Sequence, residues 1–89
     1  MPLLKKELVV KNKSGLHARP AALFVQVANK FESLITVKRD SEEVNGKSIM
    51  GILMLGAEQN STIIIEADGI DAQTALEELE KIITNEEER

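Results

Sequence analysis

Residues 15–31 read GLHARPAALFVQVANKF, and the change of pattern within this stretch decides the fold. From Pro20 onward, apolar side chains recur at helical spacing, and proline suits a first helical turn because its missing N–H costs nothing there. We therefore predict a helix over residues 18–30 with one apolar face, formed by Ala21, Phe24, Val25, Ala28 and Phe31. His17 stands immediately before this helix, at its start.

The segments on either side complete an α+β pattern. Upstream, alternating apolar residues predict a strand over residues 3–11, and residues 12–15 form a polar turn. Downstream, the periodicities predict further strands and helices: strands over 34–38, 42–44 and 61–67, and helices over 49–55 and from 72 onward. The order β-α-β-β-α-β-α predicts one sheet with helices on one face, with the fourth strand between the first and the second.

Every predicted element contributes apolar side chains to a common core. Those expected to face inward are Leu4, Leu8, Val10, Ile35, Val37, Val44, Ile63, Ile65, Ala67, Ala72, Ala75, Leu76, Leu79, Ile82 and Ile83. Ser48 and Asp71 are predicted to cap the second and third helices, and Gly56 to end the second. The tail Glu86–Glu88 lies at the negative end of the last helix dipole and is expected to fray.

Composition limits the broad class of the protein. The chain has 89 residues, which suits a single domain over residues 1–89, with a net charge of −4 and no cysteine. An acidic chain with two phenylalanines and no other aromatic residue lacks the basic surface and the stacking side chains that nucleic-acid binding needs. No stretch approaches the roughly 20 apolar residues that span a bilayer. We expect a soluble, cytoplasmic protein that neither binds nucleic acid nor inserts into a membrane.

The single histidine is the candidate reactive group. The first backbone N–H groups of a helix have no partner within it, and together with the helix dipole they attract anions. Arg19 adds a fixed positive charge and a guanidinium group that fits phosphate oxygens. Such a site favours a neutral, nucleophilic imidazole and then stabilises a dianionic phosphoryl group on it. His17 is therefore the predicted phosphoryl acceptor; the alternative is an ordinary surface histidine.

The sequence lacks the residues that a metal site or a hydrolase would need. One imidazole without a second histidine or a cysteine is a poor ligand set, so we expect no metal and no cofactor. A hydrolase is disfavoured because no serine–histidine–carboxylate set in a sensible order can be found, and a chain this short leaves little room for a deep pocket.

Two segments carry a resemblance to a known family. Residues 15–21, GLHARPA, resemble the active-site signature of the histidine-containing phosphocarrier (HPr) family of the bacterial sugar phosphotransferase system. Residues 45–53, NGKSIMGIL, resemble the regulatory-serine region of that family. The spacing of the two segments and the order of elements also match, over essentially the whole chain. The resemblance implies a monomer with an open-faced β-sandwich fold, a four-stranded antiparallel sheet in the order 1-4-2-3 under three helices.

The same resemblance implies roles and partners. An HPr receives phosphate from Enzyme I, which is charged by phosphoenolpyruvate, and passes it to the IIA domains of sugar permeases; it is a phosphorylated intermediate rather than an enzyme. The accepting atom would be Nδ1 of His17, assisted by Arg19. Ser48 matches a serine that an HPr kinase/phosphorylase modifies, which would create a determinant for a catabolite-control transcription factor. Ser48 can equally be a helix cap alone.

The short second helix is predicted to carry a docking surface. If Ile52 and Leu55 enter the core, then Ile49, Met50 and Leu53 face solvent, and exposed apolar patches commonly mark docking sites. The alternative is a helix that lies flat and buries all five residues. The resemblance adds three further residues to the partner-binding face: Ala22, Gln26 and Lys47.

The sequence departs from the family pattern in two places. Gln26 and Asn29 stand where relatives often carry lysines, so docking should depend less on salt. Asn60 stands where glycine is common, and asparagine tolerates a positive φ.

Two other functions are considered: the carrier of the nitrogen-linked phosphotransferase chain and a purely regulatory HPr-like protein. Relatives of the regulatory kind lack the active-site histidine, so His17 counts against that function.

Overall fold

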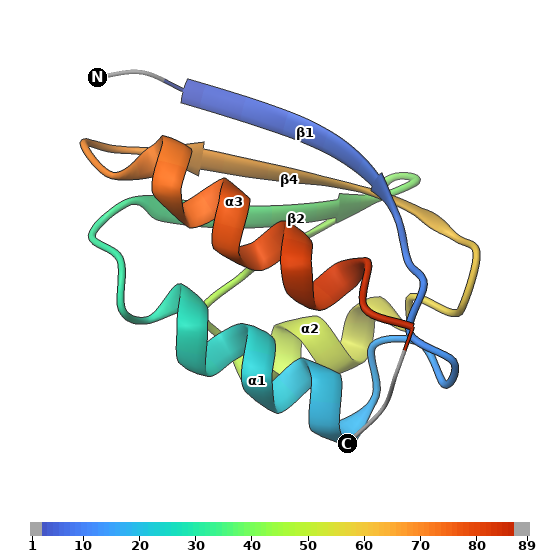
Figure 1. Cartoon of the computed structure of the whole chain (residues 1–89). Coiled ribbons are helices and arrows are strands. Elements are labelled where there is room, and N and C mark those ends of the chain that lie inside the picture. The colour runs from blue at the N-terminus through green and yellow to red at the C-terminus, as the bar shows by residue number, and fades with distance from the viewer. Residues whose placement is uncertain (1–2, 87–89) are drawn as a thin grey trace.

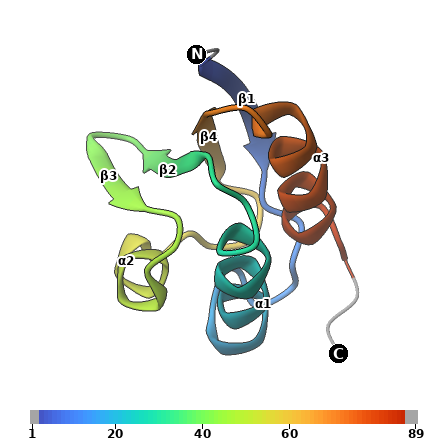
Figure 2. The ribbon, with the colours of Figure 1, turned by 90° about the vertical axis from the view of Figure 1, so that its left-hand side faces the viewer.

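A computed structural model describes residues 3–86 of the chain. Its elements follow the predicted order: β1 (Leu3–Val9), α1 (Ala18–Ala28), β2 (Leu34–Arg39), β3 (Glu42–Asn45), α2 (Ile49–Leu55), β4 (Thr62–Asp68) and α3 (Ala72–Ile83). The four strands form one antiparallel sheet in the order β1-β4-β2-β3, and the helices cover one face of it (Figures 1 and 2). The predicted open-faced sandwich is confirmed.

The core lies between the sheet and the helices. Strand β4 runs through the middle of the sheet and presents three side chains to the helices without solvent exposure: Ile63, Ile65 and Ala67. Phe24 of α1 is also fully buried, and all six residues predicted for the α3 stripe are buried. Four of the predicted core residues are only partly buried, at the margin of the core: Leu4, Val25, Phe31 and Val44. Val27, which was not predicted, packs there as well.

The opposite face of the sheet carries charged side chains that form ion pairs between strands. Lys38 Nζ lies 2.8 Å from Glu66 Oε2 on the neighbouring strand, and Lys5 approaches the same carboxylate at 3.7 Å. The hydrogen bond between Lys38 and Glu66 raises the pKa of the lysine and lowers the pKa of the carboxyl group. These ion pairs link β1, β4 and β2 on the solvent side of the sheet.

Strand β1 and helix α1 end earlier than the sequence predicts, and one expected helix cap is not formed. Strand β1 ends at Val9, because the Lys11 N–H turns away to bind the carbonyl oxygen of Ile83 at 2.9 Å. Helix α1 ends at Ala28, and its C-cap is Asn29. Asp71 does occupy the N-cap position of α3, but its side chain makes no cap hydrogen bond. The expected capping by Asp71 is therefore wrong.

The Asp71 carboxylate serves a different segment. It accepts hydrogen bonds from the backbone N–H groups of Glu32 and Ser33, at 2.9 and 3.0 Å, and from the Ser33 hydroxyl. It thus ties the start of α3 to the loop between α1 and β2. An aspartate before a predicted helix indicates a cap, but the sequence does not reveal that hydrogen-bond donors almost forty residues away will bind its carboxylate.

The other expected turns are confirmed. Ser48 caps α2, since its Oγ accepts the Gly51 N–H at 3.0 Å, and Gly56 ends that helix with a φ of 63°. Asn60 adopts a φ of 74°, as expected of an asparagine in a glycine position. The predicted fraying of Glu87 and Glu88 lies outside the described residues. No helix within residues 3–86 has the length and apolar character required to cross a membrane.

Candidate functional site at the start of α1

The loop before α1 is fixed by close backbone packing. Gly15 has a φ of 74°, and a Cβ atom there would lie 2.5 Å from the carbonyl oxygen of Ala57. The next residue, Leu16, is buried, and its N–H donates to that same oxygen at 2.8 Å. Only glycine fits such an approach with a left-handed φ. The residue that follows Leu16 is therefore presented from a rigid base.

That following residue is His17, which occupies the N-cap of α1. Its backbone is extended, with φ −98° and ψ −159°, and its carbonyl oxygen accepts the Ala21 N–H at 2.8 Å. The side chain makes no capping hydrogen bond and is exposed. The imidazole ring thus stands at the positive end of the helix without being used to stabilise it.

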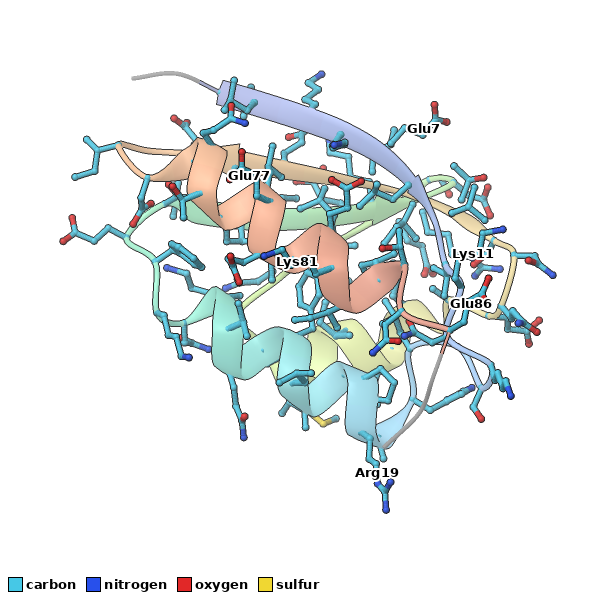
Figure 3. The ribbon with its side chains drawn as sticks, in the orientation of Figure 1. Glu7, Lys11, Arg19, Glu77, Lys81 and Glu86 are labelled. Carbon is cyan, nitrogen blue, oxygen red and sulfur yellow. The ribbon has the colours of Figure 1, made fainter. Side chains whose placement is uncertain are left out.

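The surroundings of the ring suit an anion. The first turn of α1 contains no acidic residue, and the free N–H groups and dipole of a helix start favour negative charge. An open depression of about 300 Å³ lies here, lined by Ser14, His17, Ala18, Arg19 and Pro20. Within residues 3–86 the Arg19 side chain forms no ion pair or hydrogen bond, and Figure 3 shows it pointing away from the helix into solvent. The Arg19 guanidinium is therefore free to contact an anion.

Asn12 supports this site and was not recognised from the sequence. It was placed in a polar turn, but it is only 3% exposed. Its Nδ2 donates to the carbonyl oxygens of Ile82 and Asn85, both at 2.9 Å, at the end of α3. Asn12 Oδ1 accepts no hydrogen bond from the described residues. A buried asparagine thus ties the loop before α1 to a helix end far away in sequence, a contact that no local pattern signals.

Helix α2 bears the exposed apolar surface that was predicted. Ile49, Met50 and Leu53 are 39%, 62% and 40% exposed, whereas Ile52 and Leu55 are almost completely buried. The alternative in which all five are buried is wrong. Met54, which the sequence argument left out, is 74% exposed and enlarges the patch. We call Ile49, Met50, Leu53 and Met54 the α2 patch.

The three other predicted docking residues lie near this patch but differ in exposure and in hydrogen bonding. Ala22 and Gln26 are on α1, which packs beside α2 (Figure 2), and Gln26 is exposed whereas Ala22 is half-buried. The ammonium group of Lys47 donates to the carbonyl oxygen of Phe31 at 2.7 Å. Asn29 reaches across from α1 and donates to the Lys47 carbonyl oxygen at 3.2 Å. Lys47 therefore holds the loop before Ser48 against the end of α1.

The fold and this site define a small open-faced sandwich that presents one histidine at the start of its first helix. The chain matches the protein-family model described as PTS HPr component phosphorylation site over residues 4–85. It belongs to this family, the HPr phosphocarriers of the phosphotransferase system.

Named relatives are similar over nearly the whole chain. HPr-like protein Crh of Halalkalibacterium halodurans is 48% identical over 84 residues, which cover 94% of this chain and 100% of the relative. Phosphocarrier protein HPr of Xylella fastidiosa is 45% identical over 83 residues, or 93% of each chain. The crystal structure of a phosphocarrier protein HPr from Bacillus anthracis superposes with a TM-score of 0.88 at 47% identity, covering 91% of this chain and 96% of that one.

Proposed function

We propose that this protein accepts a phosphoryl group from Enzyme I on Nδ1 of His17 and delivers it to the IIA domains of sugar permeases. The observation that carries the proposal is the placement of an uncapped, exposed imidazole at the start of α1, in a first turn without acidic residues. Membership of the HPr family supports the same role.

The chemistry is a transfer between two nucleophiles. The lone pair of the neutral imidazole attacks phosphorus, and the bond between phosphorus and the donor breaks with its electron pair leaving on the donor. The dianionic product then lies beside the free N–H groups of α1 and the Arg19 guanidinium. Delivery to a IIA domain reverses these steps with a different nucleophile.

The direct test uses phosphoenolpyruvate, magnesium and Enzyme I. The protein should gain one acid-labile phosphate, detected by intact mass, and should pass it to a IIA domain. His17→Ala should accept none, while its thermal melting should match that of the parent because the ring caps nothing. Acid-labile phosphate on a folded His17→Ala protein would show that the acceptor lies elsewhere.

The α2 patch is the proposed docking surface for Enzyme I and the IIA domains in turn. Its four apolar side chains are exposed, and methionine adapts to partners of different shape. Gln26 and Ala22 would border this surface on α1. In this exchange the protein acts as a cytoplasmic monomer, because each partner needs the same face of a single copy.

Ser48 is the proposed regulatory site. It caps α2 directly before Ile49 and Met50, so a phosphate there would stand beside the docking surface. An HPr kinase/phosphorylase would add it, and a catabolite-control transcription factor would read it. Incubation with such a kinase and ATP should modify the parent but not Ser48→Ala.

A purely regulatory role is the second candidate, favoured by the 48% identity to an HPr-like protein Crh. It predicts phosphorylation on Ser48 without any Enzyme I-dependent phosphate on His17. The carrier of a nitrogen-linked chain is a third candidate, with the same chemistry and different partners. Comparing transfer rates from Enzyme I of the sugar chain and from its nitrogen-linked counterpart separates these two carriers.

A further inference from the structure

Helix α2 carries both methionines that lie within residues 3–86. Met50 and Met54 are 62% and 74% exposed, and they stand four residues apart, so they share one side of the helix. The third methionine of the sequence is Met1. The sequence has no cysteine, so the thiol that oxidants usually attack first is absent. Among residues 3–86, sulfur oxidation is therefore confined to one side of α2.

The exposure of the two thioethers opens them to an oxidant and to an enzyme alike. On the other side of α2, Ile52 and Leu55 are almost completely buried. Peroxide can therefore reach the sulfur atoms of Met50 and Met54 without any opening of the fold. A methionine sulfoxide reductase can reach the products in the same way, and two such enzymes exist, one for each sulfoxide epimer. Oxidation and repair can both take place on the folded protein.

Oxidation by hydrogen peroxide transfers one oxygen atom to each sulfur. A lone pair of the sulfur attacks one peroxide oxygen, the O–O bond breaks, and the second oxygen leaves as water after taking the proton of the transferred one. The sulfur loses two electrons and the peroxide gains them. In the repair reaction two thiols become a disulfide, and the sulfoxide oxygen leaves as water. One full cycle thus returns the chain to its starting state.

A sulfoxide changes the character of the α2 patch, because it converts a flexible apolar side chain into a polar one. Beside Met54 lies an open depression of about 300 Å³, which is also lined by Glu42, Glu43 and Val44. The side chains of these three residues offer no hydrogen-bond donor, so a sulfoxide oxygen there would be hydrated. A docking partner would have to remove that water. Oxidation therefore makes the two most exposed members of the α2 patch polar.

The fold should tolerate this change. Helix α2 is capped at its start by the Ser48 hydroxyl and ends at Gly56, and neither contact involves a methionine. Its buried side chains are Ile52 and Leu55. Oxidation should therefore alter the surface of α2 and leave the helix in place.

We propose that Met50 and Met54 form a reversible oxidation site through which peroxide closes the α2 patch to its partners. The effect on phosphotransfer rests on the proposed function, since it requires Enzyme I and the IIA domains to dock on this patch. The imidazole of His17 keeps its reactivity. Oxidation should therefore raise the concentration of the protein that half-saturates Enzyme I and leave the chemical step unchanged.

Peptide mapping by mass spectrometry after peroxide treatment tests the site itself. Met50 and Met54 should each gain one oxygen at nearly the rate of methionine in an unstructured peptide. In the variant Leu55→Met, the buried sulfur should react far more slowly on the same helix. If that variant does not fold, the unstructured peptide remains the reference. Reductase and thiol should restore both thioethers, with the circular dichroism spectrum unchanged throughout. Much slower oxidation of Met50 and Met54 than of the peptide would overturn the proposal.

Steady-state charging by Enzyme I tests the consequence. Oxidation of both methionines should weaken docking about tenfold, seen as a higher half-saturating concentration with little change in maximal rate. Phosphoramidate, a small donor that phosphorylates histidine without docking, should modify His17 equally fast in the reduced and oxidised forms. Equal half-saturating concentrations for the two forms, or a slower reaction of the oxidised form with phosphoramidate, would contradict the proposal.

The double variant Met50→Leu/Met54→Leu is the matched control. Leucine keeps the apolar character and approximate volume of methionine but has no sulfur to oxidise. The half-saturating concentration of this variant, whatever its starting value, should be the same before and after peroxide. A rise after peroxide would show that another group is the target and would overturn the proposal. A parent protein that Enzyme I does not charge would instead overturn the phosphocarrier function, while selective and reversible oxidation of Met50 and Met54 would still support the oxidation site.

Discussion

The backbone N–H of Leu16 donates a 2.8 Å hydrogen bond to the carbonyl oxygen of Ala57. Leu16 directly precedes His17, and Ala57 directly follows Gly56, the residue that ends α2. One hydrogen bond therefore joins the loop before His17 to the end of the helix that carries the α2 patch. If partners dock on the α2 patch, as proposed, they would meet His17 at a fixed position.

Gly15→Ala should disturb the packing of the loop before His17 against Ala57. The new methyl group would meet the Ala57 carbonyl oxygen at 2.5 Å in a residue that already has a φ of 74°. We expect a loss of more than about 2 kcal/mol in unfolding free energy, from steric clash and backbone strain together, and slower phosphotransfer. Chemical denaturation and Enzyme I-dependent phosphorylation measure the two effects.

Gly56→Ala is the matched control for Gly15→Ala. Gly56 has a similar φ of 63°, but the nearest atom to a Cβ there is 3.9 Å away. Only backbone strain remains, so the cost should be about 1 kcal/mol. Equal losses of stability in the two variants would show that the contact with Ala57 is unimportant.

The sequence predicted what depends on local patterns. Helical and alternating periodicity located the elements, and the apolar spacing in α2 separated the buried Ile52 from the exposed Met50. Ser48 was recognised as a cap because its donor, Gly51, lies three residues away. The position of His17 at the start of α1 followed from the same local reasoning.

Contacts between distant segments could not be predicted. Asn12 is buried because its amide bonds the end of α3, and Asp71 misses its own helix because its carboxylate holds Ser33. Lys47 was expected to face a partner, yet its ammonium binds the Phe31 carbonyl oxygen. In each case the partner is set by tertiary packing, which no spacing within one element encodes.

Arg19→Ala should slow transfer without changing stability. Its guanidinium makes no interaction within residues 3–86, so folding loses nothing. Loss of one charged contact to the phosphoryl group costs about 1.5–3 kcal/mol, or roughly ten- to a hundredfold in rate. Rapid-quench measurement of transfer from Enzyme I and to a IIA domain checks this, with Arg19→Lys as the charge-preserving comparison. Unchanged rates in both directions would remove Arg19 from the mechanism.

Met50→Asp should weaken binding to Enzyme I and to IIA domains together. Met50 is 62% exposed, so melting should shift little, whereas a charge in the docking patch must be desolvated when a partner binds. Ile52→Asp is the contrasting variant, because Ile52 is fully buried and a charge there should unfold the domain. Titration calorimetry with each partner and thermal melting distinguish the two. A large fall in melting temperature for Met50→Asp would show that Met50 supports the core.

Asp71 should make stability depend on acid. Its pKa lies below the ordinary value of 3.8, chiefly because the Ser33 hydroxyl and the Glu32 N–H donate to the carboxylate. The folded state thus holds the proton less tightly than the unfolded chain. Its stabilising contribution is present above the ordinary pKa and is lost as the pH falls through the lower folded value.

Asp71→Asn should therefore lower the melting temperature at neutral pH, and the difference from the parent should shrink in acid. Ser33→Ala, which removes the hydroxyl donor, should reproduce part of this pH dependence. Melting curves recorded between about pH 2 and pH 7 measure it. A difference between parent and Asp71→Asn that stays constant over this range would contradict the assignment.

Phosphorylation of Ser48 should slow the charging of His17 without unfolding the protein. The Ser48 hydroxyl already sits at the start of α2, so nearly two added negative charges meet the favourable end of the helix dipole. The effect should therefore appear at the α2 patch, where a doubly charged group beside Ile49 and Met50 resists desolvation by a partner.

Ser48→Asp carries one charge and should slow the charging of His17 less than the phosphate does. Ser48→Ala removes the cap and should cost about 1 kcal/mol of stability while leaving charging unaffected at temperatures well below melting. The deciding comparison is Enzyme I-dependent phosphorylation of His17 in unmodified and Ser48-phosphorylated protein, with circular dichroism on both. Equal charging rates in two equally folded forms would leave Ser48 as a helix cap and nothing more.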